Sequence, residues 1–441
     1  MQTFTVIQYI MINLAALILG ADKVNFMERI ELVMLSKTKL RSLVKEIKDP
    51  DDRALAEMAY SQILEIKAGF LQTPCLMDWC SSGASILSAI MRDKTGMCSC
   101  GVIDANGKSS KAPGNLYQVV TDCLNGTYGT HFTKMMVKLV TLAFYYGGDK
   151  NLSDLMEGDE DKIRFYHETY ATCLPGAYAF RQAALDAWNS KAASYPFMAP
   201  DGYEIEVPVL GDSKAQHVTF SYPTVGDDGV RANIQGNADV HFKVQEARPK
   251  YILSYRKLIR NNHTKGLGAH MIHALDAFIL REIVRMSKMP KARALAILRE
   301  KLDPIVNAQG YLEGDSLAYT KEIENTVKAW EMMGVINTRI LHLVADAKGV
   351  YQIPMQMYQQ LQELVERLPE RAFDVVHIHD EFGALPQFMN DLRHCANTVY
   401  ANLYRGNVIQ YYNTVFGMKL EAGEYDPELY KTLLEVDYLL S

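Results

Sequence analysis

Two short apolar runs, far apart in the chain, constrain its fold more than any other feature because each predicts a strand that ends at an aspartate. Residues 73–77 lead to Asp78, and residues 373–378, which predict a buried strand, lead to Asp380. Carboxylates from neighbouring strands can hold two Mg²⁺ ions that clamp the attacking and leaving oxygens of a phosphoryl transfer. Taken alone, each aspartate is better explained as a turn-capping or surface residue.

The rest of the chain predicts a mostly helical protein with one strand-rich segment. Residues 3–70 predict three helices, with Asn25 and the pair Asp51/Asp52 as helix starts. Further helices are predicted after Asp78, over 131–146, twice within 152–193, over 265–287 and through 290–369, with a β-hairpin at 97–110 and strands within 201–247.

Composition excludes several classes of protein. The 441 residues allow about three domains, and 48% hydrophobic with 22% charged residues is a globular balance rather than a disordered or collagenous one. A net charge of −6 argues against a general polyanion binder, so any nucleic-acid surface is a local basic patch or belongs to a partner. Seven scattered cysteines fit a reducing cytoplasm.

The apolar run at residues 4–19 predicts a buried helix. It lacks a basic leading region, contains Gln8 and Asn13, and is too short to cross a bilayer, so a secretory or membrane-spanning role is rejected. No membrane partner is expected.

Two other patterns resemble ligand sites but are rejected. Gly101 and residues 107–109 miss the spacing of a phosphate-binding P-loop by one residue. His377 and His379 share a strand face without a third ligand nearby in the sequence, which argues against zinc.

The predicted helix at 131–146 carries two cations one turn apart. Lys134 and Lys138 are spaced to share one face, and Tyr146-Gly147 closes the helix. Such a pair can grip a triphosphate. A solvated basic face is the alternative interpretation.

The order of these motifs resembles polymerase motifs A, B and C, as found in the T-seven-like single-subunit RNA polymerases of bacteriophages. The matching segments are Asp78-x4-Gly83 with Met91-Arg92-Asp93, Lys134-x3-Lys138-x7-Tyr146-Gly147, and His379-Asp380-x-Phe382-Gly383. Three more segments are similar to this family: residues 22–30 ahead of motif A, His273-x2-Asp276-x3-Leu280-Arg281 before motif C, and Glu435-x-Asp437-Tyr438 in the C-terminal tail.

The resemblance implies an α+β protein with the right-hand polymerase fold, in which fingers helices surround a palm sheet, and without the N-terminal and thumb domains. The implied segments are 1–77 (N-terminal helical part and subunit contact), 78–130 (palm with motif A), 131–200 (fingers with motif B), 201–289 (strand-rich segment and palm helix), 290–369 (helical insertion) and 370–441 (palm with motif C and tail).

It also implies a role for each matching residue. Asp78 and Asp380 would bind two Mg²⁺ ions, with the Trp79 carbonyl as a further ligand. The remaining roles are phosphate contacts by Lys23, Lys134 and Lys138, base and ribose sensing by Tyr146, nucleic-acid contacts by Gly147 and by His273 at the minor-groove side of the hybrid end, and active-site positions for His379 and Glu381.

One residue bears on the choice between RNA and DNA synthesis. DNA-making relatives carry a glutamate at the fifth position after the motif A aspartate, where this chain has Gly83, which leaves room for the 2′-hydroxyl. Glu381 differs from the family, which usually has a small polar residue after the motif C aspartate, and makes this motif similar to that of DNA polymerases. Lys134 stands where the family usually has arginine, so it keeps the positive charge but cannot form arginine's bidentate contact with a phosphate. Gly83 is weighted above Glu381 because it acts sterically on the discriminating atom.

The expected function is therefore the catalytic subunit of a DNA-dependent RNA polymerase, acting on NTPs, a DNA template and an RNA product in the cytoplasm of an infected bacterium. The alternatives are a DNA polymerase or primase, and a non-catalytic transcription subunit. Only 77 residues precede Asp78, as in the split, two-subunit members of the family, of the coliphage N-four type. A second, smaller subunit is thus implied. The apolar run at 4–19 is either the contact with that subunit or part of this chain's own core.

The long connection between Arg281 and His379 predicts an insertion over 290–369. It is a candidate docking surface for a single-stranded-DNA-binding recruitment protein. A structural buttress is the alternative.

Overall fold

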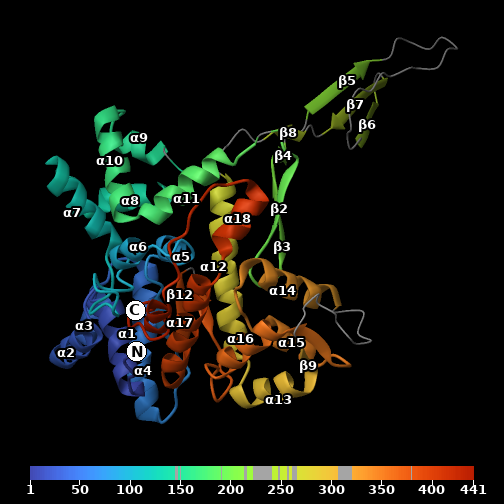
Figure 1. Cartoon of the computed structure of the whole chain (residues 1–441). Coiled ribbons are helices and arrows are strands. Elements are labelled where there is room, and N and C mark those ends of the chain that lie inside the picture. The colour runs from blue at the N-terminus through green and yellow to red at the C-terminus, as the bar shows by residue number, and fades with distance from the viewer. Residues whose placement is uncertain are drawn as a thin grey trace. The chain divides into compact units, whose positions relative to one another are not determined.

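The computed structural model describes residues 1–144, 148, 150–189, 191–212, 216–221, 241–246, 249–255, 258–260, 266–305, 320–378 and 380–441. The chain divides into a large unit of residues 1–187, 197–205 and 265–441 and a small unit of residues 188–196 and 206–264. The described part of the chain is mostly helical with small sheets, which is the predicted α+β class (Figure 1).

The N-terminal half of the large unit is almost entirely helical. Its elements are α1 (Val6–Leu19), α2 (Phe26–Ser36), α3 (Leu40–Glu46), α4 (Pro50–Ala68), β1 (Cys75–Asp78), α5 (Ser82–Ile90), α6 (Lys94–Ser99), α7 (Leu116–Tyr128), α8 (Lys134–Phe144), α9 (Lys150–Leu155), α10 (Glu160–Cys173) and α11 (Pro175–Asp186).

The second half combines helices with short strands. Its elements are α12 (Gly266–Ser287), α13 (Lys291–Lys301), β9 (Leu302–Ile305), α14 (Thr320–Met333), α15 (Arg339–Ala345), β10 (Tyr351–Pro354), α16 (Met355–Val365), β11 (Val376–Ile378), β12 (Glu381–Ala384), the 3₁₀ turn η1 (Pro386–Phe388), α17 (Met389–Arg405), α18 (Val408–Phe416) and α19 (Pro427–Leu433).

Short antiparallel strands account for the strand-rich segment predicted within 201–247. Strands β2 (Ser194–Met198) and β3 (Glu204–Pro208) pair with each other. The others are β4 (Leu210–Asp212) with β8 (Leu258–Arg260), and β5 (Gln216–Ser221), β6 (His241–Glu246) and β7 (Pro249–Tyr255) in the order β5-β7-β6.

A three-stranded antiparallel sheet in the order β1-β12-β11 joins the two predicted aspartate segments. The register pairs Leu76 with Gly383 and Asp78 with Glu381. Helices α5, α12 and α17 pack on one another beside this sheet (Figure 1). The sheet therefore brings residues from the two ends of the chain into one core.

The prediction of a buried strand over 373–378 is wrong in two respects. The strand β11 spans only Val376–Ile378, and all three of its residues are exposed, whereas β1 at the other edge of the sheet packs against α1 and is largely buried. Phe373, before the strand, is the buried residue and stacks on Phe388 with ring centroids 5.2 Å apart.

Residues 3–70 form four helices rather than three. Asn25 caps α2 as predicted, because its side chain accepts the Glu28 N–H at 2.9 Å. The cap of α4 is Asp49 rather than the predicted pair Asp51/Asp52, whose own N–H groups donate to the Asp49 carboxylate. Pro50 at the first helical position fixes that start.

The predicted hairpin at 97–110 is confirmed only around its turn. Residues 97–99 are helical in α6 instead, because Asp93 caps this helix by accepting the Gly96 N–H at 2.9 Å. A single bridge between Ile103 and Ser109 remains, closed by a turn around Asp104. The capping signal at Asp93 was overlooked.

The predicted long helix at 265–287 is confirmed as α12. The stretch 290–369 is helical only in part, since the parallel pair β9 and β10 interrupts it. Helix α1 lies with Tyr9, Ile10 and Leu14 buried, as predicted for the run at 4–19. Within the described residues, we find no helix with the length and apolar character needed to cross a membrane.

Candidate active site

Asp78 and Asp380 meet at one end of the β1-β12-β11 sheet. Asp78 is the last residue of β1 and pairs with Glu381, the first residue of β12. Asp380 occupies the turn between β11 and β12, and its carbonyl accepts the Trp79 N–H at 2.9 Å. The backbone thus holds the two acids side by side.

The charges around Asp78 oppose one another. Partial burial raises the pKa of the Asp78 carboxyl, the positive charge of Lys23 lowers it, and the negative charge of Asp380 raises it again. Lys138 adds a smaller lowering effect. The net shift is upward, with burial as its largest cause and the Asp380 charge adding to it, and a bound cation would favour the ionised carboxylate.

The loop that carries Lys23 is fixed by a buried arginine. Arg29 donates from Nη2 to the Asp22 carbonyl at 2.6 Å and from Nε to the Val24 carbonyl at 3.1 Å. Burial lowers the pKa of Arg29 to about 10, which leaves the guanidinium charged at neutral pH. The Lys23 ammonium lies 3.0 Å from the Asp22 carboxylate and is partly exposed.

The C-terminal tail packs against α2 and pairs with the end of β1. Tyr438 stacks on Phe26 with ring centroids 4.7 Å apart. Ser441 exchanges two backbone hydrogen bonds with Asp78, at 3.0 and 3.2 Å. The segments around residues 22–30 and 435–438, both named in the motif resemblance, therefore lie together beside β1.

Helix α8 presents the predicted basic pair. Lys138 is exposed, acts on the pKa of Asp78, and places its ammonium 5.7 Å from the centre of the Tyr117 ring. Lys134 lies one turn earlier and is half-buried. Burial, together with the charges of Asp380 and Asp78, raises the pKa of Tyr117 to about 12. Sequence reasoning missed Tyr117, which belongs to none of the matched motifs.

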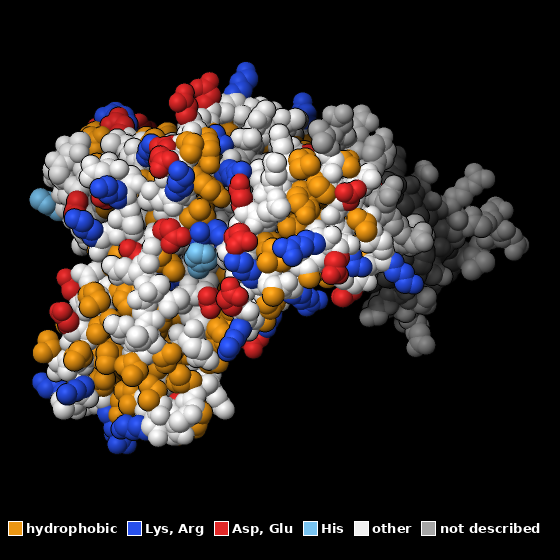
Figure 2. All heavy atoms as spheres, turned by 60° about the horizontal axis from the view of Figure 1, so that its bottom comes forward, with side chains coloured by type: hydrophobic (Ala, Val, Ile, Leu, Met, Phe, Trp, Pro, Cys, Tyr) orange, Lys and Arg blue, Asp and Glu red, His pale blue; other side chains and the backbone are white. Residues whose placement is uncertain are grey.

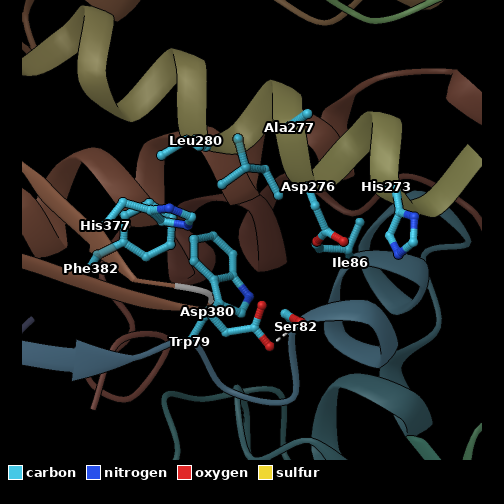
Figure 3. A pocket seen from close by; sticks show the side chains of 11 residues that line it. Trp79, Ser82, Ile86, His273, Asp276, Ala277, Leu280, His377, Asp380 and Phe382 are labelled. Carbon is cyan, nitrogen blue, oxygen red and sulfur yellow. Dashed lines mark hydrogen bonds between the residues drawn. The ribbon is translucent and has the colours of Figure 1, made fainter. Parts of the chain in front are cut away.

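Asp380 also lines a pocket of about 270 Å³ that lies between the sheet and the helices α5 and α12 (Figure 3). The residues that matter here are Ser82 and Ile86 on α5, His273 and Asp276 on α12, and Asp380 and Phe382. The Ser82 hydroxyl donates to the Asp380 carboxylate at 3.1 Å, which orients that carboxylate at the mouth of the pocket.

Asp276 also lines the pocket, although sequence reasoning named it only as part of a matched segment and gave it no role. Burial raises its pKa to about 7, with a further contribution from the charge of Asp380. Among the residues that the structure describes, the Asp276 carboxyl has no hydrogen-bond or ion-pair partner. The spacing His273-x2-Asp276, which puts both residues on one helix face, was the available signal.

The other predicted residues have the following places. Gly83 is buried in the first turn of α5, directly after Ser82. Trp79 is buried, and its indole N–H donates to the Ser85 hydroxyl at 3.0 Å. Glu381 is half-buried opposite Asp78, and His273 is exposed on α12. Tyr146, Gly147 and His379 lie outside the described residues.

The donor set fits magnesium. Mg²⁺ is usually bound through one or two protein carboxylates and completes its octahedron with water and substrate phosphates. Neither Asp78 nor Asp380 forms an ion pair within 4 Å in the described part of the chain, so both carboxylates are available. No group of three acidic, histidine or cysteine side chains among the described residues makes a complete protein cage.

Comparison of the chain with protein-family models and with curated proteins finds no match. The inference of function therefore rests on the ordered motifs and on the site they form. Two carboxylates, two lysine ammonium groups and an adjoining pocket can bind a metal-complexed polyphosphate next to an uncharged group.

Proposed function

We propose that the chain is the catalytic subunit of a DNA-dependent RNA polymerase, which joins NTPs to the 3′ end of an RNA on a DNA template and releases pyrophosphate. The observation that carries this proposal is the meeting of Asp78 and Asp380, with Lys23 and Lys138 beside them. The right-hand polymerase fold belongs to the same proposal, with the β1-β12-β11 sheet as the palm and α8 as part of the fingers.

In this proposal Asp78 and Asp380 hold two Mg²⁺ ions. When bound, these ions stabilise the charge on the attacking and leaving oxygens. The Trp79 carbonyl is proposed as a further ligand. The protein's own contribution is positioning, because the backbone pairing of β1 with β12 fixes the two carboxylates before substrate arrives.

Lysine side chains neutralise the triphosphate. Lys23 is held by the loop that Arg29 fixes, and Lys138 projects from α8 beside Tyr117. Lys134, one turn away, is proposed to reach the same phosphates. Phosphoryl transfer depends mainly on such charge stabilisation and alignment, which two or three fixed cations supply.

Ribonucleotides are the proposed substrates. Gly83 is buried at the start of α5, four positions after Trp79, and leaves no side chain to exclude a 2′-hydroxyl. Glu381 opposite Asp78 keeps a DNA polymerase as the alternative activity. We propose that Glu381 changes only the charge near the metals.

A second protein subunit is the proposed partner, and the N-terminal helices are its proposed contact. Large apolar side chains are exposed on α1, α2 and α4 and just after α4, among them Ile7, Met27, Met34, Leu35, Leu64 and Phe70. The face displayed in Figure 2 carries a broad apolar patch bordered by lysine and arginine side chains. Surfaces of this kind are typical of protein contacts. We propose the cytoplasm of an infected bacterium as the location.

The insertion over 290–369 is better supported as a buttress than as a recruitment surface. Thr338 donates its N–H to the buried Glu282 carboxylate of α12, and Arg339 donates to the Asp201 carbonyl at 2.6 Å. Asp201 also pairs with Arg281 at 2.8 Å, and this pairing lowers the pKa of the Asp201 carboxyl although burial opposes it. These contacts tie the insertion to the helix that carries His273.

The test is extension of an RNA primer on a DNA template with Mg²⁺ and either rNTPs or dNTPs, with and without extract from infected cells. The proposal expects rNMP incorporation well above dNMP incorporation, stimulated by the extract if a second subunit is missing. Preference for dNTPs would favour the DNA polymerase alternative. No extension under any condition would favour a non-catalytic subunit.

A further inference from the structure

The pocket beside Asp380 has the wrong charge for a phosphate group. No lysine or arginine lies among the described residues that line it, and its charged groups are the carboxyls of Asp276 and Asp380. The rest of the lining is two imidazoles, His273 and His377, the Ser82 hydroxyl, the Trp79 indole and apolar side chains (Figure 3). An uncharged group that offers hydroxyl donors suits this lining, because carboxylate oxygens accept hydrogen bonds.

The lysines of the proposed triphosphate site do not line this pocket. Lys23 and Lys138 act on the pKa of Asp78, and neither is among the residues that line the pocket. A triphosphate would be held by these cations. The pocket is left for the other reactant, whose attacking hydroxyl must reach the same metals.

Asp276 has a carboxyl that faces the pocket and can hydrogen-bond to such a reactant. Its carboxyl forms no hydrogen bond or ion pair in the described part of the chain, and the side chain points into the pocket between Ile86 and His273 (Figure 3). The carboxyl oxygens are not enclosed by the protein, so a ligand that enters the pocket can reach them. A pocket of about 270 Å³ has room for one sugar ring.

We propose that Asp276 accepts a hydrogen bond from the 2′-hydroxyl of the ribose at the 3′ end of the growing strand, which makes it a specificity residue for RNA over DNA primer ends. This inference rests on the proposed function, because it takes that sugar to be the reactant that delivers the 3′-hydroxyl to Asp380. The 2′-hydroxyl is the one group that distinguishes the two sugars. Gly83 would act on the incoming nucleotide, whereas Asp276 acts on the end already formed.

The experiment uses two RNA primers of identical sequence, one ending in a ribonucleotide and the other in a 2′-deoxyribonucleotide, both with a free 3′-hydroxyl. Addition of one NTP is measured in a single turnover with wild type, Asp276→Ala and Asp276→Asn. The wild type is expected to extend the ribose-ended primer at least about tenfold faster than the deoxyribose-ended primer, because one hydrogen bond to a charged group has an effect of about that size.

Asp276→Ala is expected to bring the ratio of the ribose-end rate to the deoxyribose-end rate close to one, through a larger loss on the ribose end. Asp276→Asn, which keeps an acceptor oxygen, is expected to lie between the two. The deoxyribose end is the internal control for folding, because a misfolded variant slows both primers.

Three results would overturn the inference. Equal extension of the two primers by the wild type leaves the polymerase proposal intact and removes the role of Asp276. An equal loss on both primers in Asp276→Ala assigns the residue a structural role. Extension of neither primer by the wild type removes the proposed function and this inference with it.

Discussion

Asp276 on α12 and Asp380 in the β11–β12 turn line the same pocket, although more than a hundred residues separate them. Burial raises the pKa of Asp276 to about 7, with help from the Asp380 charge, and the pKa of nearby Asp78 is raised as well. The negative charge of Asp380 thus makes the ionisation of both neighbouring carboxyls less favourable.

Magnesium is expected to stabilise the folded protein, because it relieves this repulsion. Adding millimolar Mg²⁺ to chelator-treated wild type should raise Tm by about 1–3 °C. Differential scanning fluorimetry measures the shift. Asp78→Asn and Asp380→Asn should abolish the shift, and an equal shift in the double variant would contradict metal binding at this pair.

Lys138→Ala is expected to weaken NTP use without disturbing the fold, because Lys138 is exposed on α8. Loss of its charge should lower kcat/KM for NTPs by about tenfold to a hundredfold. Steady-state incorporation measures the effect. Lys419 is exposed and does not act on the pKa of Asp78, so Lys419→Ala is the matched control; a similar loss there would argue against a specific phosphate contact.

Arg29→Met should destabilise the protein and release Lys23. The substitution leaves the carbonyls of Asp22 and Val24 without their donor, at a cost of about 2–4 kcal/mol in the free energy of unfolding. Urea unfolding measures it. The exposed Arg41→Met is the control, and comparable stability of the two variants would contradict the role given to Arg29.

His394 predicts how stability depends on pH. Burial and the neighbouring charge of Arg367 lower its pKa to about 4. The unfolded chain therefore binds a proton more readily, so the contribution of this residue to stability is present above about pH 6.5 and is lost as the pH falls towards 4. We expect a loss of about 2 kcal/mol across that range, after allowance for partial exposure.

Replacing His394 by Gln should flatten this part of the stability curve. Urea unfolding at pH 5.0, 6.0 and 7.0 measures the slope for both proteins. An identical slope in wild type and His394→Gln would show that other groups control the acid response.

Local signals were enough to predict the strand end at Asp78, the cap at Asn25 and the long helix α12. They failed where a competing local signal was overlooked, as with the Asp93 cap that makes residues 94–99 helical. They also failed for the exposure of β11, because whether an edge strand is buried depends on which helix covers it: α1 packs on β1 at the other edge of the same sheet, and β1 is largely buried.

For the candidate site, the sequence predicted the residues that belong to the motifs but not how they lie in space. Residue spacing identified Asp78 and Asp380, but their pairing through β1 and β12 depends on a contact between the two ends of the chain. Tyr117 and the burial of Asp276 come from the packing of α7, α5 and α12, which no local pattern encodes.

The central claim is that Asp380 belongs to the centre of nucleotide addition. The most direct measurement is the single-turnover rate of NTP addition to an RNA primer by Asp380→Asn, compared with Asp374→Asn, an exposed acid near the same strand that pairs with Lys288. We predict a loss of about a thousandfold or more for Asp380→Asn and a wild-type rate for Asp374→Asn. A wild-type rate for Asp380→Asn would contradict the account.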